Sequence, residues 1–288
     1  MDNFFRSLLF VPADQTNKIE KAWGLGADCV ILDLEDGVAP SRKPSARRNI
    51  AQYVPVAPRT SPSILVRINA PADERQQDLE VAIRPAVLGV LVPKCGTVPD
   101  VEAIAREVGR LEKRAGIAAG KIKLFLLVES ARGLLQLPSM AATSDRVAGI
   151  VFGAEDWCED MGIVRTKTGR ELEMARWTIA VCAHACGIPA FDTVYTDLQD
   201  IEGLVRDTEI ANNMGFAGKL AIHPSQIEPI HSVFFPSEAE IAEAEAIVAA
   251  FDKADAQGVG VIGVSGRMVD KPIAERARQT LSRARRFR

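Results

Sequence analysis

Three carboxylates crowd the end of one apolar stretch, VILDLEDGVA at residues 30–39. They are Asp33, Glu35 and Asp36. Crowded carboxylates repel one another and lose hydration, so they persist where a cation, an arginine or a reacting group offsets that cost. A solvated surface loop is the alternative interpretation. The cluster predicts a site that binds positive charge.

Polar and charged residues also follow the later apolar stretches of the chain. In a barrel of parallel strands the residues just after each strand lie on one face, and this face carries the active site in barrel enzymes. We therefore expect the side chains that follow the strands to converge. Beyond the first cluster they are Arg67, Asn69, Lys94, Glu129, Asp156, Asp192 and His223.

Glu129 and Asp156 end neighbouring predicted strands, so their carboxylates are expected to meet at one point. A pair of oxygen ligands with open positions suits Mg²⁺ better than a soft metal. The three histidines form no HxH or HxxxH pair, which argues against a zinc hydrolase. Strand alternation predicts that Glu155 and Asp156 point apart, and the pattern leaves open which is the ligand. A structural cap or ion pair is the alternative for each carboxylate.

Arg67 lies in the stretch LVRIN, where a buried guanidinium needs acidic partners. The carboxylates that follow the second strand can supply them and leave donors free for a substrate oxygen. The same carboxylates can bind waters around a metal. A purely structural network of ion pairs is the alternative.

The elements that must position these residues alternate regularly. Eight apolar stretches are separated by segments with helical spacing, several of which close on glycine. This alternation predicts an α/β fold, a (β/α)8 TIM barrel, over residues 1–235. A doubly wound open sheet is the competitor, although no phosphate-loop or dinucleotide fingerprint supports it. The predicted strands lie in SLLFVPA, CVILDLED, SILVRIN, LGVLVPKC, IKLFLLVES, VAGIVFGAED, GIPAFDTV and KLAIHP.

Residues 236–288 form a C-terminal extension with its own pattern. SEAEIAEAEAIVAAFDKADAQG predicts a helix, VGVIGVSGRMVD an extended segment punctuated by glycine, and KPIAERARQTLSRARRFR a second helix with Pro272 in its first turn. We expect this extension to act as a lid or as an arm onto a neighbouring subunit.

Composition and charge exclude several classes of protein. The chain is 47% hydrophobic and 25% charged, and no apolar run approaches the roughly 18 residues that span a membrane. A net charge of −3 gives no general attraction to nucleic acid or to anionic membranes. The five cysteines are odd in number, and the N-terminus lacks the pattern of a signal segment. A cytoplasmic protein without disulfides is expected.

Eight motifs, in order and over nearly the whole chain, resemble the citrate lyase beta-subunit-like family of the HpcH/HpaI aldolase superfamily. This family includes malyl-CoA, methylmalyl-CoA and citramalyl-CoA lyases. The motifs are RSLLFVPA, DCVILDLEDGV, LVRIN, VPK, LLVES, VFGAEDW, AIHPSQ and GRMVDKPIAERA.

The resemblance implies roles for individual residues. It makes Glu129 and Asp156 the Mg²⁺ ligands, which selects Asp156 over Glu155, and Arg67 the substrate arginine. It also implies that Asp270 reaches the active site of an adjacent subunit as an acid/base group. A cap of the last helix is the alternative for Asp270. The other expected site residues are Glu35 and Asp36 beside the arginine, and Arg6, Lys18, Ile222, His223 and Pro224 for substrate and CoA.

The function implied by the resemblance is the reversible Claisen-type cleavage of a 3-hydroxyacyl-CoA to an acyl-CoA and an α-keto acid, glyoxylate or pyruvate. The expected assembly is a homotrimer or hexamer with shared active sites. A malyl-CoA-type thioesterase on the same site is a close rival, and a class II aldolase without CoA is a second. A citrate lyase beta subunit that docks an acyl-carrier protein is the third.

Overall fold

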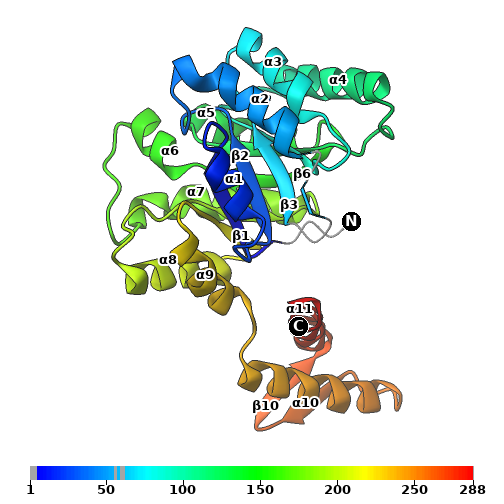
Figure 1. The fold of residues 1–288 in the computed structure, drawn as a ribbon. Coiled ribbons are helices and arrows are strands. Elements are labelled where there is room, and N and C mark those ends of the chain that lie inside the picture. Colours follow the sequence, from blue (N-terminus) through cyan, green and yellow to red (C-terminus); the bar gives the residue numbers. More distant parts are fainter. Residues whose placement is uncertain (1–4, 55–56, 59–61, 288) are drawn as a thin grey trace. The chain divides into compact units, whose positions relative to one another are not determined.

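The computed structural model describes residues 5–54, 57–58 and 62–287, and in it eight parallel strands close into a barrel in sequence order (Figure 1). The predicted (β/α)8 fold is confirmed, and the open doubly wound sheet is wrong because β1 pairs with β8. The strands are β1 Ser7–Pro12, β2 Cys29–Asp33, β3 Ser63–Arg67, β4 Gly89–Val92, β5 Lys123–Val128, β6 Val147–Phe152, β7 Ala190–Asp192 and β8 Gly218–Ala221.

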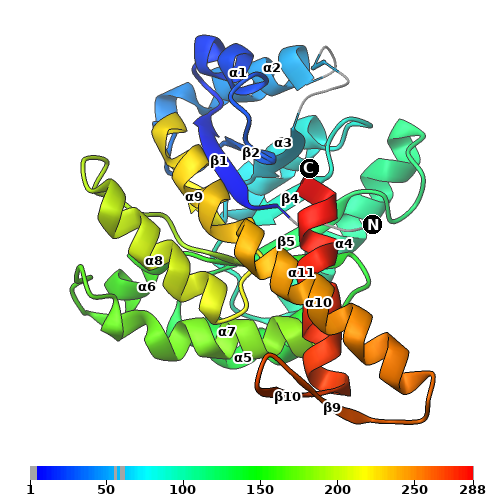
Figure 2. The ribbon, with the colours of Figure 1, turned by 90° about the horizontal axis from the view of Figure 1, so that it is seen from below.

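Helices surround these strands, as Figure 2 shows. Two of them begin at a capping side chain. Thr97 and Ser130 cap the helices that follow β4 and β5 by accepting hydrogen bonds from backbone N–H groups. Short 3₁₀ turns cover Pro40–Arg42, Arg170–Leu172 and Pro224–Gln226. The α-helices are α1 Thr16–Ala22, α2 Lys43–Tyr53, α3 Ala72–Ala82, α4 Val98–Ala115, α5 Ala131–Ala141, α6 Ala154–Met161, α7 Glu173–Ala185, α8 Ile201–Asn213 and α9 Ile227–Phe234.

Apolar side chains fill the barrel interior. The rings of Phe125 and Phe191 lie 6.2 Å apart between centroids. A Cβ on Gly149 would come within 2.6 Å of the Phe125 ring, so a glycine on β6 makes room for it. Leu127 and Leu220 belong to this core and also line a cavity at the carboxyl ends of the strands. The packed core therefore forms the floor of that cavity.

The chain divides into two compact units, Met1–Ile230 and His231–Arg288, whereas the sequence predicted a boundary after residue 235. The second unit contains α10 Glu238–Asp255, the antiparallel hairpin of β9 Val261–Val264 and β10 Arg267–Asp270, and α11 Lys271–Phe287. The extended segment predicted from the glycines is this hairpin.

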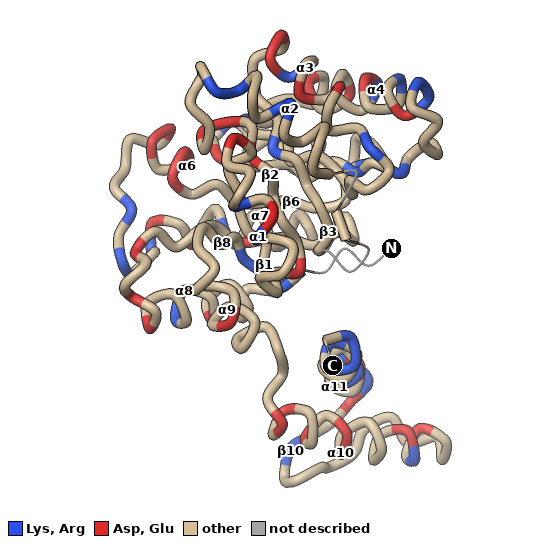
Figure 3. The backbone as a smooth tube through the Cα atoms, in the orientation of Figure 1, with Lys and Arg blue, Asp and Glu red and all other residues tan. Residues whose placement is uncertain are grey.

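A small apolar cluster of Phe251, Val269 and Ala274 holds the second unit together. Ser237 and Glu240 form a reciprocal capping box at the start of α10. Lysines and arginines gather along α11 (Figure 3). In the part of the chain that the structure describes, no helix has the length and apolar character needed to span a membrane.

Candidate active site

A cavity of about 640 Å³ opens at the carboxyl ends of the barrel strands. Residues from β1, β3 and the loops after β2, β5, β6, β7 and β8 form its wall, together with part of α1. Most of the residues singled out in the sequence lie here. Those that line the cavity are Lys18, Asp33, Asp36, Arg67, Glu129, Glu155, Asp156, Ile222, His223 and Pro224.

Arg67 is held by two carboxylates that follow β2. Its Nε and Nη2 donate to the two oxygens of Asp33 at 2.7 and 2.6 Å, because Asp33 and Arg67 are direct partners in the strand register. Its Nη1 lies 3.1 Å from Glu35 Oε2 and 4.0 Å from Asp36 Oδ2. The ion pairs expected between this cluster and the arginine are therefore present.

The loop after β2 wraps around Asp33. The backbone N–H groups of Glu35 and Gly37 each donate to this carboxylate at 2.9 Å. A Cβ on Gly37 would come within 2.3 Å of Asp33 Oδ2, so only glycine permits the close approach. The guanidinium of Arg67 also lies over the ring of Phe10, with its central carbon 4.9 Å from the ring centroid. This cation–π contact is a further constraint on the arginine.

Glu35 lies beside the arginine and is not part of the cavity wall. Its side chain is 5% exposed, and its Oε2 accepts no hydrogen bond despite being buried. Burial raises the pKa of Glu35 to about 7 although the nearby Arg67 lowers it. Lys94 approaches the other oxygen, Oε1, at 3.9 Å. The contact of Glu35 Oε2 is thus its ion pair with Arg67 Nη1 at 3.1 Å.

Glu129 follows β5 directly, and its residue is only 4% exposed. Its Oε1 accepts from the backbone N–H of Lys94 at 2.6 Å, and Lys94 adopts a left-handed backbone with φ of 51°. Burial, and then repulsion by Asp156, raises the pKa of Glu129 to about 8. A Cβ on Gly153 would lie 2.8 Å from Glu129 Oε2, so this glycine leaves room for the carboxylate.

Asp156 does not end a strand, in contrast to the sequence interpretation. β6 ends at Phe152, and Asp156 lies in the first turn of α6. The expected separation of Glu155 and Asp156 is also wrong, because in a helix successive residues are 100° rather than 180° apart and both line the cavity.

This end of the barrel carries more negative than positive charge. Five carboxylates, those of Asp33, Glu35, Asp36, Glu129 and Asp156, surround the cations of Arg67 and Lys94. Oxygen donors in excess of cations are what a hard divalent cation requires. The donor set therefore fits Mg²⁺ held by Glu129 and Asp156. Among the described residues no group of three or more acidic, histidine or cysteine side chains is placed to hold a metal ion.

Arg6 and Lys18, both expected to bind substrate or CoA, lie in different parts of the barrel. Arg6 precedes β1 and binds Asp28 through Nε at 2.9 Å and Nη2 at 2.8 Å. This pair lies at the amino ends of β1 and β2, and Arg6 does not line the cavity. Lys18 does, on α1, and so does Lys21, which the sequence analysis missed. The three-residue spacing of the two lysines on one helix face was the available signal.

The remaining expected residues have local partners. The Nδ1 of His223 lies 2.8 Å from Ser225 Oγ, just after β8. Asp270 ends β10 in the second unit, and its Oδ1 accepts from the backbone N–H of Ile273 at 3.2 Å. Asp270 thereby caps the start of α11. All five cysteines are free, as expected.

Residues 6–224 match the family model described as HpcH/HpaI aldolase/citrate lyase. The chain belongs to this family. It is 36% identical over 280 residues to the citrate lyase subunit beta of Escherichia coli K12, which covers 97% of this chain and 93% of the relative. It is 35% identical over 281 residues to the (3S)-malyl-CoA thioesterase of Cereibacter sphaeroides ATCC 17023, covering 97% and 94%.

Among solved structures, the CitE protein of Mycobacterium tuberculosis in complex with magnesium, acetoacetate and coenzyme A is similar with a TM-score of 0.80. It is 33% identical and covers 99% of each chain. The family, the barrel and the prediction of an enzyme from a lyase family are thereby confirmed.

Proposed function

We propose that this protein is a Mg²⁺-dependent carbon–carbon lyase that cleaves a 3-hydroxyacyl-CoA reversibly to an acyl-CoA and glyoxylate or pyruvate. The observation that carries this proposal is one cavity whose wall contains both Arg67 and the pair Glu129 and Asp156. A keto acid and a thioester enolate each need a positive partner, and the metal and Arg67 would supply one to each of the two fragments.

Glu129 and Asp156 would hold the metal, since both line the cavity and repulsion by Asp156 adds to the burial that raises the pKa of Glu129 to about 8. The bound ion would supply Lewis-acid chemistry at the keto acid. The magnesium in the related CitE complex supports this assignment. Glu35 and Asp36 would hold Arg67 and accept hydrogen bonds from waters around the ion, since Asp36 lines the cavity and both lie beside the guanidinium.

Arg67 would stabilise the thioester enolate as negative charge develops on its oxygen. Its Nε and Nη2 are committed to Asp33, so the Nη1 edge beside Glu35 and Asp36 faces the reacting group. The fixed guanidinium needs no reorganisation during the reaction.

CoA would enter along α1 and the loop after β8. Lys18 lines the cavity with Ile222, His223 and Pro224, so it would bind the CoA phosphates while the loop would pack on the pantetheine. The coenzyme A in the related CitE complex supports a CoA thioester as substrate.

Asp270 would take or return the proton at the α-carbon, supplied by an adjacent subunit of a homotrimer or hexamer. Replacement of Asp270 by Asn keeps an acceptor for the Ile273 N–H and removes the acid/base group. We expect turnover to fall by at least about a hundredfold with metal affinity unchanged. Equal losses of turnover and metal affinity would remove this role.

The thioesterase is the second candidate, because a (3S)-malyl-CoA thioesterase is 35% identical over 97% of this chain. Hydrolysis would use the same residues and an added water. The third candidate is a citrate lyase beta subunit that acts on a substrate bound to an acyl-carrier protein, because citrate lyase beta subunits are among the relatives.

A coupled assay with Mg²⁺ separates these candidates. Malyl-CoA and citramalyl-CoA are supplied while keto acid and free thiol are followed independently, and acetyl-CoA or propionyl-CoA with glyoxylate tests the reverse direction. Keto acid without thiol establishes the lyase. Thiol without keto acid establishes the thioesterase, and neither product from CoA esters favours the carrier-bound substrate.

A further inference from the structure

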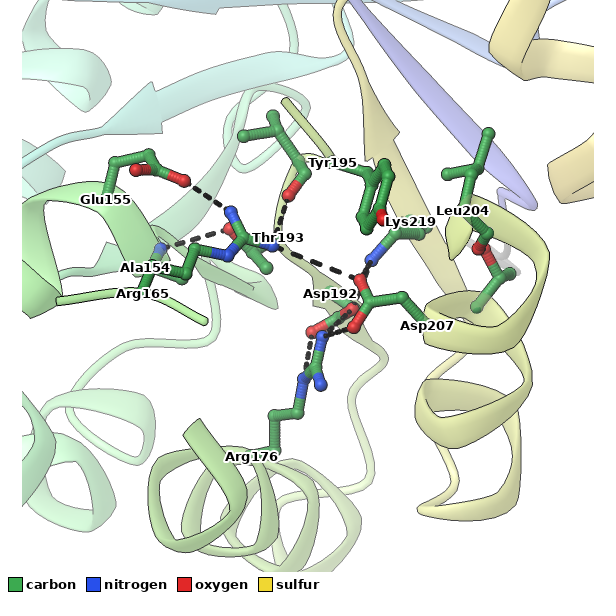
Figure 4. Close-up of polar contacts among 12 residues, drawn as sticks. Ala154, Glu155, Arg165, Arg176, Asp192, Thr193, Tyr195, Leu204, Asp207 and Lys219 are labelled. Carbon is green, nitrogen blue, oxygen red and sulfur yellow. Dashed lines mark hydrogen bonds and ion pairs between the residues drawn. The ribbon is translucent and has the colours of Figure 1, made fainter. Parts of the chain in front are cut away.

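Arg165 lies outside the cavity wall, yet it joins two parts of that wall (Figure 4). Its Nη1 binds Glu155 on α6, and its Nη2 donates to the carbonyl of Val194, after β7, at 2.7 Å. Glu155 and Val194 both line the cavity. The arginine side chain is 14% exposed and that of Glu155 is 50% exposed, so this ion pair spans from the interior to the surface.

The start of α6 depends on contacts from outside the helix. Gly153 occupies the N-cap position and has no side chain that could cap it. The N–H of Ala154 donates instead to Thr193 Oγ1 at 3.0 Å, again from the segment after β7 (Figure 4). The first turn of α6, which carries Asp156, is therefore held by Thr193 and Arg165 against the loop after β7.

Arg165 is itself anchored on a buried ionic cluster. Its Nη2 lies 4.0 Å from Asp207 Oδ2. Asp207 binds Arg176 at 2.7 Å and Lys219 at 2.6 Å, and both of these cations also bind Asp192 (Figure 4). The guanidinium of Arg165 thus contacts the buried cluster through Asp207 and α6 through Glu155.

We propose that Arg165 is a positioning residue for the metal site. It fixes the first turn of α6 to the loop after β7 and thereby sets the direction of the Asp156 carboxylate. A planar guanidinium donates in two directions at once, which a lysine ammonium on a flexible stem does not reproduce. This inference rests on the proposed function, in which Asp156 is a metal ligand.

The test is the binding of Mn²⁺ alone, as a probe for Mg²⁺, to the full chain, measured by calorimetric titration. Arg165→Gln removes the fork, and Arg165→Lys keeps the charge. Arg146→Gln is the matched control, because Arg146 is 15% exposed, binds one carboxylate, Glu112, at 2.6 Å, and donates to the Ile122 carbonyl at 3.1 Å. Arg146 stands at the amino end of β6, away from the cavity wall.

We expect Arg165→Gln to weaken Mn²⁺ binding about tenfold or more, as other residues that orient metal ligands do. Arg165→Lys should weaken it by a smaller factor, and Arg146→Gln should leave it unchanged at a similar loss of melting temperature. Affinity within about twofold of the parent in Arg165→Gln, or an equal loss in Arg146→Gln, overturns the proposal.

If Arg165→Gln does not fold, Arg165→Lys decides, since parental affinity in that variant also overturns the proposal. Glu129→Gln separates the two levels of inference. A parent chain that binds no Mn²⁺ refutes the metal site together with the role of Arg165. Binding that is lost in Glu129→Gln but kept in both Arg165 variants refutes the role of Arg165 alone.

Discussion

Arg67 and Arg176 each bind at least two carboxylates, and the two clusters differ in charge balance. Arg176 binds Asp192 and Asp207, and Lys219 contributes a second cation to the same two acids. Every group in this cluster is buried or nearly so. The charges of Lys219 and Arg176 outweigh the burial of Asp207 and hold its pKa below its usual range.

At the cavity the balance is reversed. Arg67 binds Asp33 and Glu35, but further carboxylates follow on the loops after β5 and β6. Burial raises the pKa of Glu35 to about 7 against the charge of Arg67, and burial with repulsion by Asp156 raises that of Glu129 to about 8. The comparison teaches that a cluster with balanced charges stabilises the fold. A cluster with more carboxylates than cations, here called incomplete, can instead bind a cation and a substrate.

The largest expected effect separates the two arginines by activity. Arg67→Lys keeps a positive charge but loses the bidentate contact with Asp33. The ammonium would therefore be poorly positioned to stabilise the enolate oxygen. We expect kcat to fall by about 10²–10³ with a smaller change in KM. The measurement is steady-state kinetics on the CoA ester identified by the coupled assay. A kcat within tenfold of the parent would remove Arg67 from the chemistry.

The matched variant of the buried cluster should lose stability instead. Arg176→Met leaves Asp192 and Asp207 with Lys219 alone, and breaking a buried ion pair costs about 3–5 kcal/mol. We expect this loss in the free energy of unfolding measured with urea, while kcat of the folded protein falls far less than in Arg67→Lys. A large drop in kcat without a loss of stability would contradict the division between the clusters.

The free energy of unfolding should depend on pH because the pKa of Glu129 is raised in the folded state. The folded pKa of Glu129, about 8, lies above its unfolded value of roughly 4.3, so the native state binds the extra proton between these values. Without metal, the free energy of unfolding should therefore fall as pH rises through this window, by a few kcal/mol at most. Asp207 has the opposite sign, since its contribution is present above an unfolded pKa of about 3.9 and is lost in acid.

Glu129→Gln tests this assignment, because the amide has no proton to lose. In urea unfolding at about pH 5 and about pH 9 without metal, the variant should show a smaller loss of stability than the parent. Added Mg²⁺ should restore stability to the parent at the higher pH and not to the variant. An unchanged pH slope in the variant would mean that Glu129 is not the titrating group.

The smallest effect concerns the backbone of Lys94, whose φ of 51° is rare for a residue with a Cβ. Both Lys94→Gly and Lys94→Ala keep the N–H that Glu129 accepts, so both should retain Mn²⁺ binding. Glycine relieves the left-handed strain, and we expect it to be about 1 kcal/mol more stable than alanine in thermal unfolding. The reverse order would show that this backbone is not strained.

Several features of the site were predictable because they depend on residues close in sequence. The apolar stretches and the helical spacing between them determine that strands and helices alternate, and this alternation leads to the barrel and to one face for Arg67 and Glu129. The placement of Asp156 failed because the apolar stretch VAGIVF runs into AEDW without a punctuating residue other than Gly153. Nothing local marks the strand's end.

The contacts of Arg165, Thr193 and Arg6 had no signal in the sequence. Arg165 lies 29 positions from Val194, and Arg6 lies 22 from Asp28, so only the closed barrel brings them together. The sequence by itself determined the order of the elements and the types of residue at their ends, because backbone geometry converts local periodicity into helix or strand. The tertiary structure alone decided which charges meet, because strand register, tilt and closure set distances between side chains far apart along the chain.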